Sequence, residues 1–247
     1  MRAVSEAVIL LAGSGSRLRT ADERFLKPLV PILGRPLIYY AFDALLEVGV
    51  ENITAITGYA SERMTVAVRE LAPPDLELRF VHNPDWQKKN GISVLAAAAH
   101  VTAPFILMVG DHLFAPGIID RFLRATARDC TSLAIDRKLD SIFDLNDAMK
   151  VQTRGDGIAE IGKGLPKYDA IDTGLFICRE SIFDYLERAK KNEDCSLADG
   201  IRLMAKNDQV RVFDIGDAWW QDVDTPEMLE HAETLLASAN AVSARNR

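Results

Sequence analysis

The chain has 247 residues, 48% of them hydrophobic, and a formal net charge of −7 at neutral pH. This length suits one α/β domain, and the apolar share is enough for a substantial core. The negative charge argues against general binding to nucleic acid or to a membrane surface, because either would favour a basic patch. Anionic ligands must therefore be held by local cations or by a metal.

The cysteines and the hydropathy indicate a cytoplasmic protein. Cys130, Cys178 and Cys195 are far apart and include no CxxC pair, so neither a disulfide framework nor a zinc site is expected. The N-terminal segment lacks a secretory signal, and no run approaches the ~20 apolar residues of a membrane span. We expect no direct membrane insertion, and the oligomeric state stays open.

Strand and helix patterns alternate along the first part of the chain. Strands are expected at 8–11, 52–57, 76–81, 105–109 and 132–136, and helices at 37–48, 62–71, 92–100 and 118–128. This alternation predicts βαβ units in a mixed, mostly parallel twisted sheet flanked by helices, a Rossmann-like α/β fold. Ligands of such sheets bind at the carboxyl ends of the strands.

After about Lys138 the pattern changes. Shorter β segments are expected at 151–157, 158–163 and 170–178, followed by two helices, a strand at 210–215 and a final helix from about Pro226. No proline- or glycine-rich linker separates this part from the first. We interpret it as a small β-rich substrate lid that is continuous with the core.

The segment from Val8 to Leu29 carries the strongest functional signal. An apolar strand ends in a turn of small residues, and two cations, Arg17 and Lys27, follow. Glycine lets a backbone approach a ligand closely, and successive N–H groups in such a turn form an anion-binding concavity. The spacing fits neither a Walker A loop nor a dinucleotide fingerprint. It predicts a nucleoside triphosphate site. The residues expected to contact the nucleotide are Leu11, Ala12, Gly13, Ser14, Gly15 and Ser16.

These residues resemble the signature L-A-A-G-x-G-x-R-L followed by K-P-L of the nucleotidyltransferases that activate sugar or alcohol phosphates. The match covers 10–18 and 27–29, with Leu11 where the family usually carries alanine. The resemblance implies a nucleotidyltransferase of GT-A-like fold. It also implies that Arg17 neutralises the departing pyrophosphate and that Lys27 contacts the reacting phosphates, so both are candidate catalytic residues.

Acidic residues at two places are candidates for holding Mg²⁺. Asp111 follows the 105–109 strand, so its carboxylate should emerge beside the glycine turn. Mg²⁺ takes one or two carboxylates together with substrate phosphates, although a strand-end aspartate can also be a plain cap. Asp222 and Asp224 lie in a segment that resembles the family's W-x-D-V-D-T-P-E, in which the later aspartate is the usual metal partner. We therefore assign the metal to Asp111 and Asp224, with Asp222 as the alternative, and Asp111 is also a candidate catalytic residue.

A second diagnostic stretch, NPDWQKKNGIS at 83–93, resembles the cytidylyltransferases that act on inositol 1-phosphate and phosphocholine. Asn90 and Ser93 are candidates for reading a pyrimidine edge or holding a ribose, and helix capping is the alternative. Gly110-Asp111-His112 resembles the inositol-phosphate branch in particular. We interpret His112 as a wall or structural residue, because a phosphate nucleophile needs no general base at neutral pH.

Residues 162–176 are expected to build the acceptor site. Lys163 is a candidate phosphate contact, although an exposed hairpin explains it nearly as well. Asp172 is a candidate to accept a hydrogen bond from a polyol hydroxyl, and Gly174 would allow close backbone approach. The run Y-D-A-I-D-T-G-L-F within this stretch resembles the inositol-phosphate branch again.

These motifs favour an enzyme that transfers CMP from CTP to a small phosphorylated alcohol similar to inositol 1-phosphate, with Mg²⁺ as cofactor and release of pyrophosphate. The alternatives are a sugar-1-phosphate nucleotidyltransferase using another nucleoside triphosphate, a phosphocholine or phosphonate cytidylyltransferase, a non-catalytic nucleotide sensor, and a glycosyltransferase. We expect a single domain with a nucleotide-binding half at 1–137, an acceptor-binding half at 138–230, and a C-terminal helix and tail at 231–247.

Overall fold

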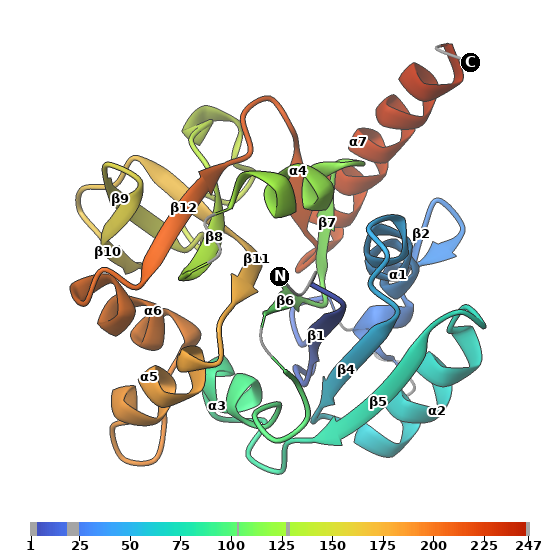
Figure 1. Ribbon diagram of the computed structural model, residues 1–247. Helices are drawn as coiled ribbons and strands as arrows, with labels where there is room; N and C mark the ends of the chain where they lie inside the picture. Colours follow the sequence, from blue (N-terminus) through green and yellow to red (C-terminus); the bar gives the residue numbers. More distant parts are fainter. Residues whose placement is uncertain (1–3, 19–24, 103, 127–128, 246–247) are drawn as a thin grey trace.

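A computed structural model describes residues 4–18, 25–102, 104–126 and 129–245, with side chains to residue 241 (Figure 1). The strands are β1 (Glu6–Leu11), β2 (Pro31–Ile32), β3 (Arg35–Pro36), β4 (Asn52–Thr57), β5 (Glu77–His82), β6 (Phe105–Val109), β7 (His112–Phe114), β8 (Thr131–Asp136), β9 (Lys150–Arg154), β10 (Gly157–Gly162), β11 (Ala170–Cys178), β12 (Val210–Asp214) and β13 (Trp220–Asp222). The helices are α1 (Leu37–Glu47), α2 (Ser61–Leu71), α3 (Asn90–Leu95), α4 (Ile118–Ala125), α5 (Ser181–Ala189), α6 (Leu197–Lys206) and α7 (Pro226–Arg245), with short 3-10 turns η1 (Lys27–Leu29) and η2 (Leu139–Ser141).

Nine strands form one sheet in the order β5-β4-β1-β6-β11-β8-β12-β10-β9. The pairings of β5, β4, β1 and β6 are parallel, as is that of β8 with β12, whereas β11 and β10 run opposite to the others. A further pairing of β9 with β11 curls this end of the sheet back on itself. The predicted mixed, mostly parallel sheet is confirmed, and the β-rich second part extends that sheet.

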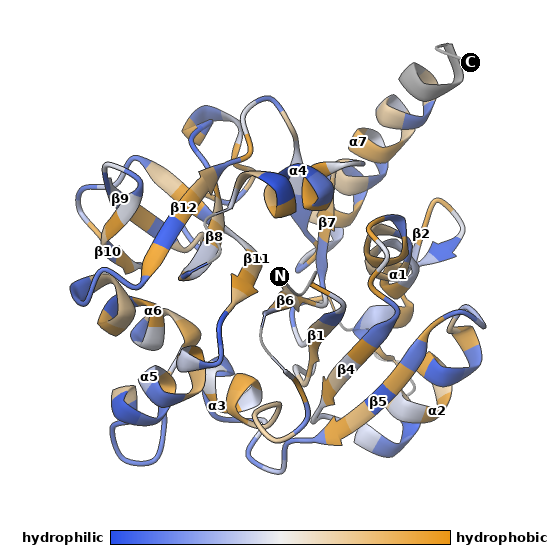
Figure 2. Ribbon diagram, in the orientation of Figure 1, coloured by the Kyte–Doolittle hydropathy of each residue, from blue (hydrophilic) through white to orange (hydrophobic). Residues whose placement is uncertain are grey.

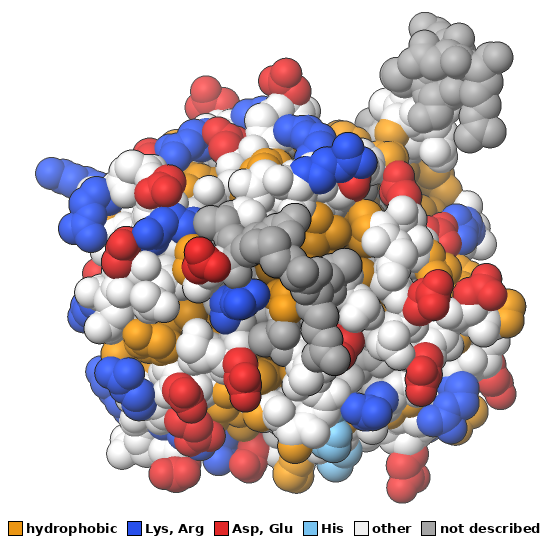
Figure 3. Space-filling view, viewed as in Figure 1, with side chains coloured by type: hydrophobic (Ala, Val, Ile, Leu, Met, Phe, Trp, Pro, Cys, Tyr) orange, Lys and Arg blue, Asp and Glu red, His pale blue; other side chains and the backbone are white. Residues whose placement is uncertain are grey.

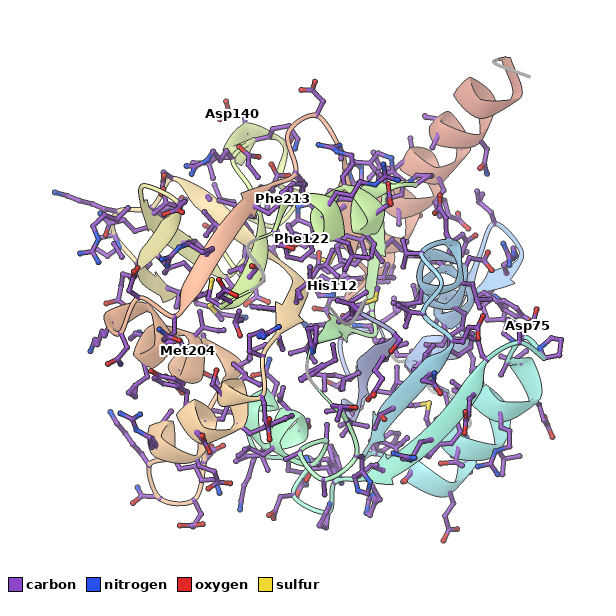
Figure 4. The ribbon with its side chains drawn as sticks, in the orientation of Figure 1. Asp75, His112, Phe122, Asp140, Met204 and Phe213 are labelled. Carbon is purple, nitrogen blue, oxygen red and sulfur yellow. The ribbon has the colours of Figure 1, made fainter. Side chains whose placement is uncertain are left out.

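Helices cover both faces of the sheet. Apolar side chains of α1, α2 and α4 pack on one face, and those of α3, α5 and α6 pack on the other. Figure 4 shows Phe122 of α4 beside Phe213 of β12, with ring centroids 5.1 Å apart, and Met204 of α6. The central strands are mainly hydrophobic in Figure 2, as expected for strands buried on both faces. α7 packs over a smaller third cluster and then projects from the body (Figure 1).

Local sequence explains where the elements begin and end. At the start of α6, Ser196 Oγ accepts a hydrogen bond from the Asp199 N–H, and the Asp199 carboxylate accepts one from the Ser196 N–H. This capping box satisfies donors that a helix N-terminus leaves free. The helix expected at 92–100 is shorter, because residues beyond Leu95 form tighter bonds, such as His100 N–H to Ala97 O. The spacing of their apolar residues is typical of an α-helix, but their backbone forms i to i−3 hydrogen bonds, which make a tighter turn.

Charges of both signs are interspersed on the surface. On the face shown in Figure 3, lysine and arginine side chains alternate with aspartate and glutamate over most of the described surface. The acidic net charge of −7 is therefore spread out, and binding of an anionic ligand has to depend on particular side chains.

Candidate active site

A cavity of about 200 Å³ opens where β1 and β6 end, at the carboxyl edge of the sheet. Its lining comprises Leu10, Leu11, Gly13, Gly15, Ser16, Arg17, Lys27, Pro28, Gly110, Asp111 and Asp224. Most residues predicted for the nucleotide and the metal are in this set. A larger hollow of about 720 Å³ lies at the opposite edge, beside the starts of β1, β4 and β5, and its lining contains no predicted site residue.

The small-residue turn wraps closely around the lysine. Gly15 has φ +62°, and a Cβ on it would lie 2.9 Å from Cβ of Lys27. Glycine is required at this position both for its backbone conformation and for the close approach. The turn is fixed by two hydrogen bonds, from the Leu18 N–H to Gly15 O at 3.1 Å and from the Tyr59 N–H to Ala12 O at 3.0 Å.

Lys27 joins the two predicted metal ligands. Its ammonium donates to Asp111 Oδ2 and, at 2.6 Å, to Asp224 Oδ1, and its side chain is only 10% exposed. Burial lowers the pKa of Lys27, but the charges of Asp111 and Asp224 outweigh that effect and hold it above its ordinary value. Two carboxylates from distant parts of the chain therefore point at one cation.

A pair of short strands explains why these acids meet. β7 follows β6 directly and pairs antiparallel with β13, so that His112 lies opposite Asp222. The Val223 N–H also donates to Asp111 O at 3.0 Å. This ladder fixes the start of β7 against the end of β13, which places Asp224 over Asp111. Neither strand was predicted, because three residues are too few to show an alternating pattern.

His112 holds the other oxygen of Asp111. The distance from Nδ1 to Asp111 Oδ1 is 2.6 Å, and the imidazole stacks on Trp220 with centroids 5.6 Å apart. Burial raises the pKa of Asp111, but the charges of Lys27 and His112 outweigh that effect, so the pKa lies far below its ordinary value. Figure 4 shows His112 near the middle of the molecule. This contact fits the structural role expected for His112, because the imidazole holds one oxygen of Asp111 in place.

The two candidates for the second metal ligand lie in different places. Asp224 lines the cavity, where its Oδ2 also accepts from Arg17 Nη2 at 2.5 Å. Asp222 lines a neighbouring cavity of about 230 Å³ beside Trp220. Burial raises the pKa of Asp222. The structure thus places Asp224 in the cavity lining with Asp111, whereas Asp222 lies outside that lining but near enough to feel the charge of Asp111.

None of the predicted acceptor residues Lys163, Asp172 and Gly174 lines this cavity, and Lys163 is linked to it through Asp147. Arg17 Nη1 donates to Asp147 Oδ2 at 2.7 Å, and Lys163 Nζ donates to Asp147 Oδ1 at 2.5 Å. Asp147 was not predicted, because it belongs to an irregular turn with no motif around it. Asp172 Oδ1 accepts from the Gly174 N–H at 2.7 Å, and burial raises the pKa of Asp172 to about 6.

Comparison of the sequence with known families places most of these site residues in a family of nucleotidyltransferases. The family model described as the MobA-like NTP transferase domain matches residues 7–198. The chain belongs to the MobA-like NTP transferase family. This confirms the resemblance drawn from the N-terminal signature.

Individual proteins that are similar to this NTP transferase indicate which members of the family it resembles. The chain is 32% identical to the bifunctional IPC transferase and DIPP synthase of Aquifex aeolicus, over 94% of this chain and 52% of that protein. It is 33% identical to the protein of the same name from Thermococcus kodakarensis, over 93% of this chain and 50% of that one. The chain therefore spans about half the length of these relatives. The inositol-1-phosphate CTP transferase from T. maritima superposes with a TM-score of 0.84 at 27% identity, covering 96% of this chain and 97% of that one.

Within this NTP transferase, two predicted base contacts lie away from the cavity lining. Asn90 Oδ1 accepts from the Leu197 N–H at 2.9 Å, which joins the start of α3 to the start of α6. Ser93 is buried, and its hydroxyl accepts from Asn83 Nδ2 at 3.0 Å. A role for either residue in reading the nucleotide base stays a prediction. Ala12 and Ser14 belong to the turn but are not part of the cavity wall.

The donor set of the NTP transferase suits a metal that arrives with its substrate. Among the described residues, no group of three or more His, Cys, Asp or Glu side chains could hold a metal. Asp111 and Asp224 supply carboxylate oxygens at one point, and Mg²⁺ commonly combines one or two carboxylates with substrate phosphates and water. The chemistry therefore fits Mg²⁺, on condition that the Lys27 ammonium shifts toward the phosphates.

Within the described chain, no helix is long and apolar enough to cross a membrane.

Gly174 makes room for His112, which gives a first prediction. Gly174 has φ +74°, and a Cβ there would lie 2.9 Å from Cδ2 and Nε2 of the imidazole. Gly117 has the similar φ of +75° with nothing within 4 Å. Gly174→Ala should therefore destabilise the protein by about 1–3 kcal/mol more than Gly117→Ala, because only the former overpacks the core. Equal urea midpoints and slopes for the two variants would contradict this close packing.

Proposed function

We propose that the protein transfers a cytidylyl group from CTP to the phosphate of a phosphorylated polyol, with inositol 1-phosphate as the acceptor. The observation that carries this proposal is the meeting of Lys27, Asp111 and Asp224 at the mouth of the small-residue turn. The name of the T. maritima structure, an inositol-1-phosphate CTP transferase, supports the choice of nucleotide and acceptor. The free state of its three cysteines supports a reducing compartment such as the cytoplasm.

The proposed reaction is an in-line displacement without a covalent enzyme intermediate. An oxygen of the acceptor phosphate attacks the α-phosphorus of CTP, the bond from the α-phosphorus to the bridging oxygen breaks, and pyrophosphate leaves with that oxygen. A phosphate monoester is already ionised at neutral pH, so the step needs no general base. Catalysis then consists of positioning the two phosphates and neutralising charge as it develops.

The side chains divide this work by their positions. Lys27, which lines the cavity between Asp111 and Asp224, would neutralise the α-phosphate and the incoming oxygen. Arg17 would bind the leaving pyrophosphate through its planar guanidinium, which suits phosphate oxygens. Asp111 and Asp224 would hold Mg²⁺, which when bound neutralises the triphosphate charge. Lys163 would bind the acceptor phosphate, and Asp172 would accept a hydrogen bond from a hydroxyl of the polyol.

A matrix of substrates tests this proposal. Pyrophosphate release should be fastest with CTP and inositol 1-phosphate, compared with UTP, GTP and dTTP, and with glucose 1-phosphate, phosphocholine and an aminoalkylphosphonate. Mg²⁺ should be required in every active combination. If CTP is the poorest donor, or if a sugar 1-phosphate is the best acceptor, the proposed substrates are wrong. Nucleotide binding without any turnover would favour a nucleotide sensor instead.

A further inference from the structure

The carboxylate of Asp147 bridges two cations, Arg17 of the cavity lining and Lys163 of the acceptor half. One oxygen binds Arg17 of the nucleotide turn and the other binds Lys163 of the acceptor half. The hydrogen bond from Lys163 and the charges of both cations hold the pKa of Asp147 below its ordinary value. Asp147 is therefore an anion, and it sits where two substrate phosphates are expected to arrive.

The turn that carries Asp147 is anchored to the acceptor half. Lys150 Nζ, which is buried, donates to Asn146 O at 3.2 Å and to Lys163 O at 3.0 Å. The Asp147 N–H also donates to Asp144 Oδ1 at 3.2 Å. These bonds fix the backbone beside Lys163, so the contact of Asp147 with Arg17 is made by the side chain alone. Rotation of this side chain can release Nη1 of Arg17 without unfolding the turn, while Nη2 keeps its contact with Asp224.

The ion pairs of Asp147 differ from those of Lys27 in their exposure. The side chains of Arg17, Asp147 and Lys163 are 49%, 40% and 54% exposed, whereas Lys27 is 10% exposed. Exposed ion pairs contribute little, because water screens them and long side chains lose entropy. A phosphate dianion is a stronger partner for arginine and lysine than a single carboxylate. The contacts of Asp147 are thus readily exchanged for phosphate contacts.

We propose that Asp147 acts as an internal competitor for substrate phosphate, occupying Arg17 and Lys163 in the free protein and leaving them when CTP and the acceptor bind. The inference rests on the proposed function for the roles of these two cations. In this scheme Asp147 sets the affinity for substrate and prevents unproductive binding of free phosphate. It contacts no reacting atom, and its replacement should change binding rather than the chemical step.

The test is the affinity of folded protein for pyrophosphate and for CTP, measured by calorimetry with Mg²⁺ and without acceptor. Asp147→Asn and Asp147→Ala should each lower the dissociation constant by about three- to ten-fold, which corresponds to losing one or two exposed ion pairs. KM for both substrates should fall while kcat changes less than about two-fold. Asp140→Asn is the matched control. Asp140 lies in the same connection between β8 and β9 as Asp147, but it is exposed at the outer surface of the molecule (Figure 4). The affinities of this variant should equal those of the unmodified protein.

The opposite result separates competition from a structural role. If Asp147 instead orients Arg17 and Lys163, both Asp147 variants will bind pyrophosphate more weakly, and the proposal is overturned. Unchanged dissociation constants overturn it as well. Because pyrophosphate binding needs neither cytosine nor an acceptor, this measurement stays decisive even if turnover with CTP fails. Failure of the proposed function would appear as absent turnover in the unmodified protein.

Discussion

Replacing Asp111 by asparagine should lower the turnover number by about 10²- to 10³-fold, the loss typical of removing one preorganised electrostatic contact. The asparagine side chain has the size of the aspartate that it replaces but lacks the charge that the carboxylate would give to Mg²⁺. The chain should stay folded, because Lys27 retains Asp224 as a partner. Steady-state kinetics at saturating substrates would give the turnover number, and Mn²⁺ binding in the presence of CTP would report the metal independently of turnover.

A matched pair of variants sharpens this prediction. Asp224→Asn should reduce both turnover and Mn²⁺ binding as Asp111→Asn does, since both carboxylates face the same ammonium. Asp222→Asn should have a much smaller effect, because Asp222 lines the neighbouring cavity. If Asp222→Asn is the damaging variant and Asp224→Asn is nearly normal, the second metal ligand has been assigned wrongly. Near-normal turnover of Asp111→Asn would remove the metal assignment altogether.

Replacing Asp172 by asparagine should stabilise the protein at neutral pH while weakening its use of the acceptor. The amide oxygen of the new side chain can still accept the hydrogen bond from the Gly174 N–H, but the side chain carries no charge to desolvate. Burial raises the pKa of Asp172 from an ordinary value of 3.8 to about 6. A shift of this size corresponds to about 1–3 kcal/mol once partial solvent access is considered.

The sign of the pH dependence follows from proton binding. Between about pH 4 and pH 6 the folded protein keeps the Asp172 proton that the unfolded chain has lost. The contribution of Asp172 to stability is therefore present below pH 4 and falls as the pH rises through 6. The difference in unfolding free energy between Asp172→Asn and the unmodified protein should be near zero at pH 4 and reach its full value by pH 7.

Urea unfolding from pH 4 to pH 8 measures this difference directly. The same variant should show a higher KM for inositol 1-phosphate, because the neutral amide is a weaker acceptor for a hydroxyl than a carboxylate. Such an exchange of stability for function is common at binding sites. A variant that is no more stable at pH 7 would show that Asp172 is well solvated, and an unchanged KM would remove it from the acceptor site.

Much of the fold could be predicted from the sequence because its elements have strong local signals. The strand at 105–109 is a run of apolar residues that ends at Gly110, and the structure places β6 at the same residues. The turn at Gly13–Ser16 and the cations after it likewise lie where the motif predicts. In these cases a local pattern and the final packing agree.

The rest depends on contacts that no local pattern encodes. The register between β7 and β13 brings Asp224 to Asp111, yet each strand is only three residues long. Asp147 reaches Arg17 across 130 positions of the sequence, from a turn whose residues carry no motif. Asn90, a predicted base contact, accepts from the N–H of Leu197, a partner 107 positions away that its local sequence does not reveal. Tertiary partners decided each of these outcomes.

We propose, before all else, that Asp111 and Asp224 jointly bind a divalent cation on the triphosphate. A crystal structure of the protein with CTP and Mn²⁺, using the anomalous signal of the metal, tests it most directly. We predict one manganese peak bridging the two carboxylates and a phosphate oxygen, with the Lys27 ammonium moved from between the carboxylates onto the phosphates. Nucleotide density with Lys27 still bound to both carboxylates, and manganese elsewhere or absent, would contradict the account.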